Sequence, residues 1–289
     1  MLRKPAVAGQ FYAGTREKLK EEIRGCFLDS RGPGSLPEKG EMKLGIKGAV
    51  APHAGYMYSG AIAAHSYKAI AEDGFADTFI ILGPNHTGMG SGVSLYHRGE
   101  WETPFGKVPI DEEIAKKLLG GIIDMDEDAH RYEHSIEVQL PFLQFIEENF
   151  SIVPICMAMQ DVDTSKEVGE ALARAIKDSD KRVVVIASTD FSHVGLNYMN
   201  SPPRGKGVDE YAREQDKKAI DKILEMDPEG LIERVYSERI SMCGYGCVAA
   251  MLFAVRELGA RNAKLLKYGT SYEVVPGESC VGYGALIVY

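Results

Sequence analysis

Four side chains in this 289-residue chain have the chemistry and setting of a reactive site: His53, His86, His193 and Cys243. Neutral imidazole and thiolate both bind first-row transition metals. Each histidine lies in a loop just after an apolar run, and Cys243 lies in a glycine-bearing turn before an apolar helix, where a thiolate is favoured. A lone loop histidine is more often a hydrogen-bonded group, and a lone cysteine more often a small buried residue. The context that the three histidines share favours a metal site.

Buried strands are expected to carry these histidines to one rim. Residues 48–51 are small or β-branched and stop at Pro52, which removes a ladder donor, and residues 78–82 form an apolar run typical of a strand buried on both faces. His53 and His86 each follow such a run and a proline. Ligands of open α/β sheets bind at the carboxyl ends of strands, so neighbouring strands would bring both imidazoles together.

The rest of the chain alternates between strand and helix patterns. Helices are expected at 15–28, from 61, and at 111–119, 164–177, 208–226 and 247–258, with a further helix from Pro228. Residues 136–146 approximate a helical apolar stripe, with Pro141 as a kink or a boundary. Strands are expected at 93–96, 107–110, 151–157, 182–188, 263–269 and 281–289. This alternation predicts an α/β fold, a single three-layer α/β/α domain over residues 1–289 with a mostly parallel or mixed central sheet. The excursion around Trp101 is expected to wall the pocket.

Several further residues are candidates for contacts around the site. His130 and His134 are spaced i,i+4 in HRYEH and could chelate a metal on one helix face, although this is not the HExxH order. A role next to the metal or against a substrate is the favoured prediction for His134 and Glu137. Asp190 either orients an imidazole or caps a turn. Tyr58 either lines the pocket or fills core.

Composition and charge exclude some classes of protein. Apolar residues make up 45% and charged residues 26% of the chain, which is typical of a globular protein with a sizeable core. The 33 basic and 42 acidic residues give a net charge of −9, which disfavours a nucleic-acid partner and leaves neutral or cationic ligands open. Five scattered cysteines predict a reducing compartment, and no apolar run suits a signal peptide or a membrane span. We therefore expect a cytoplasmic protein that binds a small molecule or a peptide, with no membrane partner.

Six ordered motifs resemble the Memo (mediator of cell motility) family along nearly the whole chain: RKPAVAGQFYAG, APHAGYMYSG, LGPNHTG, EHSIEVQLPFLQ, STDFSHVG and MCGYG. That family is similar in fold to the LigB-like class III extradiol dioxygenases, in which a non-haem iron cleaves catechol rings. The resemblance implies that His53, His86 and Cys243 are metal ligands and that His193 is the acid/base histidine. Family members are described as redox-active metal proteins with iron or copper, and eukaryotic ones as signalling partners.

The cysteine departs from the dioxygenase pattern of two histidines and one carboxylate. A thiolate ligand suits Cu(I), Zn²⁺ or an electron-rich iron, so ring cleavage does not carry over with the fold. The leading hypothesis is a redox-active, oxidoreductase-like protein with one transition-metal ion, iron or copper ahead of zinc. The alternatives are a zinc-dependent hydrolase in the same pocket and a non-enzymatic protein that binds a ligand or peptide.

Overall fold

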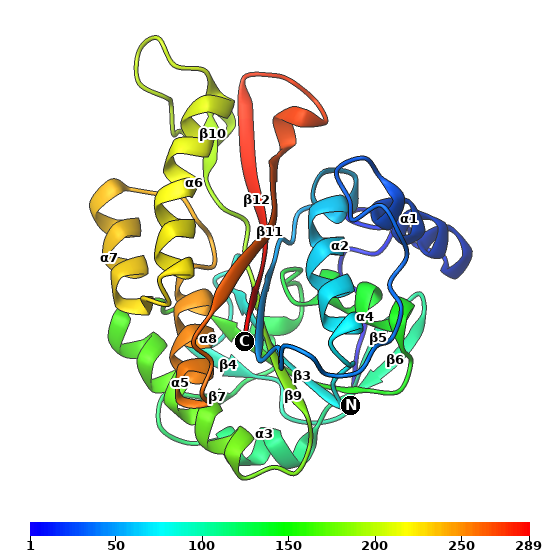
Figure 1. Ribbon diagram of the computed structural model, residues 1–289. Coiled ribbons are helices and arrows are strands. Elements are labelled where there is room, and N and C mark those ends of the chain that lie inside the picture. The colour runs from blue at the N-terminus through cyan, green and yellow to red at the C-terminus, as the bar shows by residue number, and fades with distance from the viewer.

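A nine-stranded mixed sheet forms the middle layer of the computed structural model, which describes residues 1–289 (Figure 1). Four neighbouring strands at its centre run parallel, in the order β2 (Gly48–Ala51), β9 (Val183–Ser188), β3 (Thr78–Pro84) and β8 (Ser151–Met157). Nearly every residue of these strands is buried, as expected for parallel strands covered on both faces. Their carboxyl ends consequently lie at one edge of the sheet.

Antiparallel strands extend both sides of this parallel centre. On one side, β12 (Ser279–Val288) pairs with β2, and it also pairs with β10 (His193–Gly195) and β11 (Ala263–Thr270). On the other side, β4 (Val93–Leu95) runs antiparallel to β8, and β7 (Asp124–Met125) runs parallel to β4. A separate three-stranded sheet contains β1 (Leu2–Arg3), β5 (Glu100–Thr103) and β6 (Gly106–Pro109). The predicted α/β class with a mixed sheet is confirmed.

Helices cover the two faces of the large sheet (Figure 1). One face carries α1 (Arg16–Leu28), α2 (Tyr56–Glu72) and α4 (Leu140–Ile146), and the other carries α5 (Val162–Lys177), α6 (Val208–Leu224), α7 (Pro228–Glu238) and α8 (Tyr245–Glu257). The short α3 (Glu112–Leu118) packs beside α5, and its N-cap Asp111 accepts a hydrogen bond from the amide of Ile114. None of these helices combines the length and the apolar character that crossing a bilayer requires.

The apolar stripe over 136–146 is divided beside Pro141, which the sequence predicts as a kink or a boundary: a 3₁₀ turn, η2 (Glu137–Gln139), is followed by α4, and Pro141 lies in the first turn of that helix. Two other segments differ from the sequence prediction. Upstream, η1 (Asp128–His130) ends before His134, so the two histidines of HRYEH do not share a helix face. The excursion around Trp101 packs in the small sheet and does not wall the cavity described below, so that prediction is wrong.

Candidate metal centre

The topology of the sheet gathers three loops that follow parallel strands. His53 is the second residue after β2, His86 is the second after β3, and Asp190 is the second after β9. Strand β9 lies between β2 and β3, so Asp190 comes from the strand between the two that carry the histidines. The residues that the sequence places after buried strands therefore meet at one edge, where α/β sheets commonly bind ligands.

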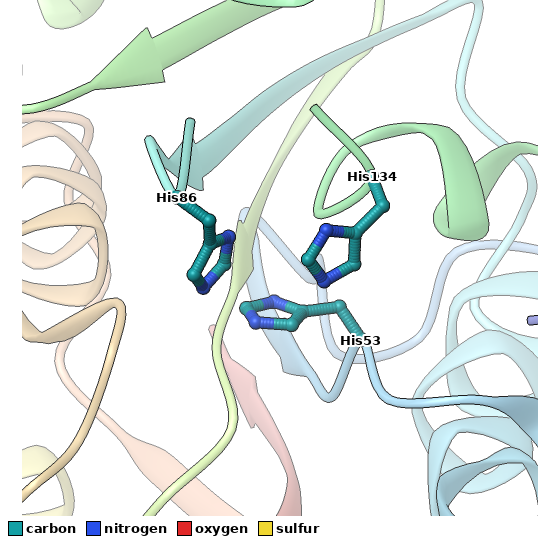
Figure 2. A group of neighbouring side chains, drawn as sticks. All are labelled: His53, His86 and His134. Atoms are coloured by element: carbon teal, nitrogen blue, oxygen red, sulfur yellow. The ribbon is translucent and has the colours of Figure 1, made fainter. Parts of the chain in front are cut away.

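Three imidazoles form the centre of this edge, those of His53, His86 and His134 (Figure 2). One ring nitrogen from each lies within 4.8 Å of the others. The rings of His86 and His134 stack with centroids 4.7 Å apart, and the ring of His53 meets both edge-on at 5.1 and 5.4 Å. His53 is buried, whereas His86 is solvent-accessible, so the cluster is open on one side.

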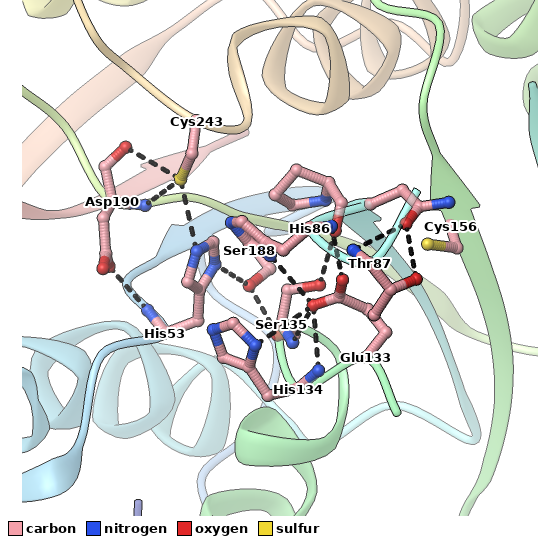
Figure 3. Close-up of polar contacts among 12 residues, drawn as sticks. His53, His86, Thr87, Glu133, His134, Ser135, Cys156, Ser188, Asp190 and Cys243 are labelled. Carbon is pink, nitrogen blue, oxygen red and sulfur yellow. Dashed lines mark hydrogen bonds and ion pairs between the residues drawn. The ribbon is translucent and has the colours of Figure 1, made fainter. Parts of the chain in front are cut away.

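The protonation of His53 follows from its contact with Ser188 (Figure 3). The Ser188 hydroxyl donates to the carbonyl oxygen of Ser135 at 2.6 Å and accepts from the side-chain amide of Gln139 at 2.8 Å. Nδ1 of His53 lies 2.8 Å from the same hydroxyl oxygen, whose only proton is already used, so Nδ1–H is the donor. Nε2 of His53 therefore keeps its lone pair. Burial also lowers the pKa of His53 well below its ordinary value, which favours the neutral ring.

Glu133 fixes the second imidazole in the same way. This buried carboxylate accepts from Nδ1 of His86 at 2.9 Å and from the backbone amide of His86 at 2.6 Å. Burial alone would raise the pKa of Glu133, but its hydrogen bond to His86 and the charge of that ring lower the pKa to about 2. An ionised carboxylate only accepts, so Nδ1 of His86 is the donor and its Nε2 is left to bind a ligand.

Cys243 lies in the turn before α8 and contacts the ring of His53 on the side away from Ser188 (Figure 3). Its Sγ lies 3.2 Å from Nε2 of His53 and accepts a hydrogen bond from the backbone N–H of Asp190 at 3.2 Å. Gly244 permits this approach, because a Cβ there would lie 2.5 Å from the carbonyl oxygen of Ser188. Burial raises the pKa of the Cys243 thiol, and the charge of Asp190 acts in the same direction, so a metal ion would have to displace the proton.

His134 belongs to the imidazole cluster itself. Its sequence context favours a role next to the metal or against a substrate, so the structure places His134 closer to the other two imidazoles than the sequence predicts. Its backbone N–H donates to Glu133 at 2.8 Å, and its ring packs against Phe11 with centroids 4.6 Å apart. Burial lowers the pKa of His134 to about 4, so the ring is neutral near pH 7. Sequence reasoning missed Glu133 and Ser188, because neither follows a strand–proline pattern. The signal that could have found them is that Glu133 opens the motif EHSIEVQLPFLQ and Ser188 opens the motif STDFSHVG.

A cavity of about 720 Å³ opens in front of the three imidazoles. Asp190, His193 and Tyr58 all line it. Nδ1 of His193 lies 3.0 Å from the carbonyl oxygen of Ser241, which can only accept, so Nε2 of His193 is the nitrogen free to take a proton. Asp190 accepts from the backbone N–H of His53 at 2.8 Å and so holds the loop that carries that ligand.

Glu137 lies behind this cavity and is fully buried. It accepts hydrogen bonds from the backbone of Ala6 at 2.7 Å and from the hydroxyl of Tyr12 at 2.7 Å, and it pairs with the guanidinium of Arg3. These contacts fasten the N-terminal segment that carries Phe11 to the site. Glu137 is thus one layer removed from the histidines and is not among the residues that line the cavity.

The donor set of this edge suits a transition metal. His53 and His86 each have Nδ1 engaged by a hydrogen bond, so Nε2 is the nitrogen that each ring offers to a metal. Burial alone would lower the pKa of His86, but the hydrogen bond to Glu133 and its charge raise it, so a metal ion competes with a proton for this Nε2. A third imidazole lies beside them, and a cysteine sulfur is in contact with one ring. Nitrogen and sulfur donors of this kind are preferred by zinc, copper and iron, whereas calcium and magnesium prefer oxygen. Both fixed rings have the hydrogen-bonded second nitrogen that metal-binding histidines usually show.

Known proteins resemble this chain over its full length. The family model described as "Memo-like protein" matches residues 3–287. A MEMO1 family protein from Methanopyrus kandleri is 47% identical over 291 residues, covering 99% of each chain. Another from Methanothermobacter thermautotrophicus is 47% identical over 289 residues, covering 99% of this chain and 100% of the relative.

A solved structure is similar in fold. An uncharacterized protein from Escherichia coli K12 superposes with a TM-score of 0.56 at 14% sequence identity, covering 84% of this chain and 99% of that chain. At this identity the likeness concerns the fold, and it agrees with the mixed α/β architecture. The full-length relatives and the family model extend over every motif discussed above, from the N-terminal segment to Cys243. The chain therefore belongs to the Memo-like family.

Proposed function

We propose that this protein holds one transition-metal ion through His53, His86 and Cys243 and works as a redox-active, oxidoreductase-like protein. The observation that carries the proposal is the pair of imidazoles whose Nδ1 atoms are both engaged by hydrogen bonds, so that their Nε2 atoms are left as ligands. Hydrogen bonds that fix ring orientation in this way are typical of metal sites. Iron and copper come before zinc in this proposal, because a set of two nitrogens and one sulfur accommodates both of their common oxidation states.

The surroundings of Cys243 support its assignment as the third ligand. Its sulfur already lies against Nε2 of His53, and the amide of Asp190 donates to it, which stabilises the thiolate that a metal requires. His134 is the alternative third donor, since its ring nitrogen lies within 4.8 Å of the nitrogens of the other two imidazoles. Cys243 contacts His53 but is not part of the compact group of donor atoms that the three histidines form, so its use as the third ligand requires its sulfur to approach His86 when the ion binds. The cysteine is preferred in this proposal because a sulfur donor suits Cu(I) and iron.

A bound ion of this kind would supply electron-transfer or Lewis-acid chemistry at the floor of the cavity. The protein's own contribution is proton handling and orientation. His193 holds its ring by donating from Nδ1 to Ser241, so its Nε2 can accept a proton from a ligand in the cavity. Asp190 keeps the His53 loop in place, and Tyr58 forms part of the wall. Under this proposal, the metal and His193 are also the groups that would carry out dioxygenase-like chemistry.

Zinc is the second candidate, because imidazole and cysteine donors are also its preferred ligands. In that version a bound zinc ion would supply Lewis-acid chemistry for hydrolysis, and His193 again moves the proton. The two versions share every residue. They differ in the metal that the protein selects and in whether the site changes oxidation state.

Metal analysis tests the proposal. Protein purified without added metal, then reconstituted anaerobically with Fe²⁺, Cu⁺ or Zn²⁺, is expected to retain one equivalent of ion after gel filtration. His86→Ala and Cys243→Ser should each lose most of it. His65→Ala is the matched control, because His65 lies on α2 and contacts the carbonyl oxygen of Arg31 instead of the cluster. Full retention by both site variants, or no retention by the wild type, would contradict the proposal.

A further inference from the structure

The wall of the cavity carries acidic side chains but no lysine or arginine. Twenty residues line the cavity in front of the imidazoles, and no lysine or arginine is among them. The two ionisable acids of the wall are Asp190 at the floor and Glu278 near the mouth. Sites that recognise phosphate or carboxylate groups usually provide arginine, lysine or a helix N-terminus for them. Histidine rings and the N-terminus of α2, whose N-cap is Gly55, also line the cavity, and these groups belong to the end where the metal would be held. Near Glu278 the wall therefore offers an anionic substituent no lysine or arginine.

Aromatic and apolar side chains make up much of the rest of the wall. Tyr58, Tyr198 and Tyr283 all line the cavity, and the ring of Tyr198 lies 5.0 Å from that of His193, nearly perpendicular to it. Leu196 and Val275 stand at the rim with 67% and 52% of their surface exposed. Aromatic faces bind flat apolar groups and attract cations, and they do neither for anions.

Glu278 lies on a part of the rim that hydrogen bonds between two neighbouring segments hold in place. Strand β10 pairs with β12 so that Gly195 lies opposite Ser279, and the amide of Asn197 donates to the hydroxyl of Ser279 at 3.3 Å. This pairing joins the two loops that form the mouth. Glu278 has no ion-pair partner in the structure, whereas the nearby Glu273 pairs with Arg213 at 2.6 Å. The carboxylate of Glu278 is therefore free to meet a ligand.

We propose that this cavity selects apolar, ring-containing molecules whose end facing the mouth is neutral or positively charged, and that Glu278 supplies the preference for the positive charge. An organic ammonium group at that end would meet the Glu278 carboxylate and the tyrosine faces, whereas a carboxylate or phosphate there would meet the like charge of Glu278 with no lysine or arginine on the wall to offset it. This inference rests on the proposed function in one respect: the end of the ligand that faces away from the mouth is placed at the metal.

Three phenols that differ at the distal group test this selection: tyramine, 4-ethylphenol and 3-(4-hydroxyphenyl)propanoate. Binding is measured by ligand-observed NMR, first with chelator-treated protein, so that no ion can capture the carboxylate, and then with the metal-loaded protein. Tyramine is expected to bind best and the propanoate at least about tenfold more weakly, a difference of about 1.4 kcal/mol. Glu278→Gln should remove most of the preference for tyramine over 4-ethylphenol, and Glu278→Lys should favour the propanoate.

Glu273→Gln is the matched control, because it removes a carboxylate from the same hairpin tip that is already paired with Arg213. It should leave the order of the three probes unchanged. The inference is overturned if the propanoate binds the wild type as well as tyramine does, if Glu278→Gln keeps the full preference for tyramine or Glu278→Lys keeps the wild-type order, or if no probe binds below about 10 mM. Metal content measured on the same samples separates the outcomes: loss of charge selection with one ion retained refutes this inference alone, and charge selection without metal retention refutes the proposed function alone.

Discussion

The sulfur of Cys243 lies 3.2 Å from Nε2 of His53, although 190 positions of sequence separate the two residues. The contact exists because two segments meet at the same edge of the sheet. Strand β2 ends there just before His53, and the turn before α8 reaches that edge from the other side, where Gly244 packs against the end of β9. Nε2 of His53 is also the ring atom that Ser188 leaves free. These two facts give His53 the central place in the site.

Ser188 is expected to control the metal affinity of His53 without touching the ion. In Ser188→Ala the Nδ1–H loses its acceptor, so the ring can turn or change tautomer, and affinity should fall about ten- to a hundredfold. Competition with a chromophoric chelator measures this change. Ser66→Ala is the control, because Ser66 is another fully buried serine whose hydroxyl donates only to a backbone carbonyl, that of Val50. Equal affinities in the two variants would contradict the role of Ser188.

Glu133 is expected to do the same for His86. Glu133→Gln keeps the shape of the side chain but removes the charge that accepts from Nδ1 of His86. Metal affinity should again fall about ten- to a hundredfold, and the loss should be reproduced with each metal that the wild type retains. Isothermal titration with the metal in a competing buffer measures it. An unchanged affinity would mean that the contact only supports the loop.

Glu137 is expected to affect stability more than metal binding. Glu137→Gln leaves the guanidinium of Arg3, which is 5% exposed, without its buried carboxylate, and this should lower the free energy of unfolding by roughly 3 kcal/mol. Asp221→Asn breaks only the exposed pair with Lys217 and should cost less than about 1 kcal/mol. Urea denaturation of the two variants gives both values. The folded Glu137 variant should still bind one ion, and failure to do so would place Glu137 within the site.

The contribution of Asp216 to the stability of the protein is expected to fall as the pH rises from about 4 to about 6. Burial raises the pKa of Asp216 to about 6, even though the side chain accepts hydrogen bonds from the amide of Ser192 and the hydroxyl of Tyr268, and His193 lies near enough to lower it. Between the ordinary pKa of an aspartate and this raised value, the folded state holds a proton on Asp216 that the unfolded state has lost, so the contribution of this group to stability declines with pH.

Asp216→Asn isolates this effect. The difference in unfolding free energy between wild type and variant should change by about 2 to 3 kcal/mol between pH 4 and pH 7, with the wild type losing stability relative to the variant as the pH rises. Urea denaturation at several pH values measures it. Parallel curves for the two proteins would show that Asp216 does not titrate in this range.

Much of the fold and part of the site could be predicted from sequence. The buried strands are recognisable as apolar runs that stop at a proline or a polar loop, and β8 spans the residues 151–157 that its sequence indicates. The position of His53 and His86 after such strands needed no structure. From these elements only the fold class could be inferred. The order of the strands in the sheet could not, because it depends on contacts between segments far apart in the chain.

The residues that support the ligands could not be predicted, for a physical reason. Ser188 is the last residue of β9 and Glu133 lies in the polar stretch HRYEH, and each acts through a hydrogen bond that exists only after folding. The place of His134 in the cluster depends on irregular backbone between η1 and η2, where no periodic pattern indicates which way a side chain points. Trp101, expected at the pocket, instead packs under the guanidinium of Arg3.

X-ray absorption spectroscopy of the metal-loaded protein tests the central claim most directly, because it reports the donor atoms around the ion. We predict one sulfur scatterer, at about 2.3 Å if the ion is zinc, together with imidazole nitrogens, and loss of the sulfur component in Cys243→Ser. A metal surrounded only by nitrogen and oxygen, with a spectrum that Cys243→Ser leaves unchanged, would contradict the assignment of His53, His86 and Cys243 as the metal ligands.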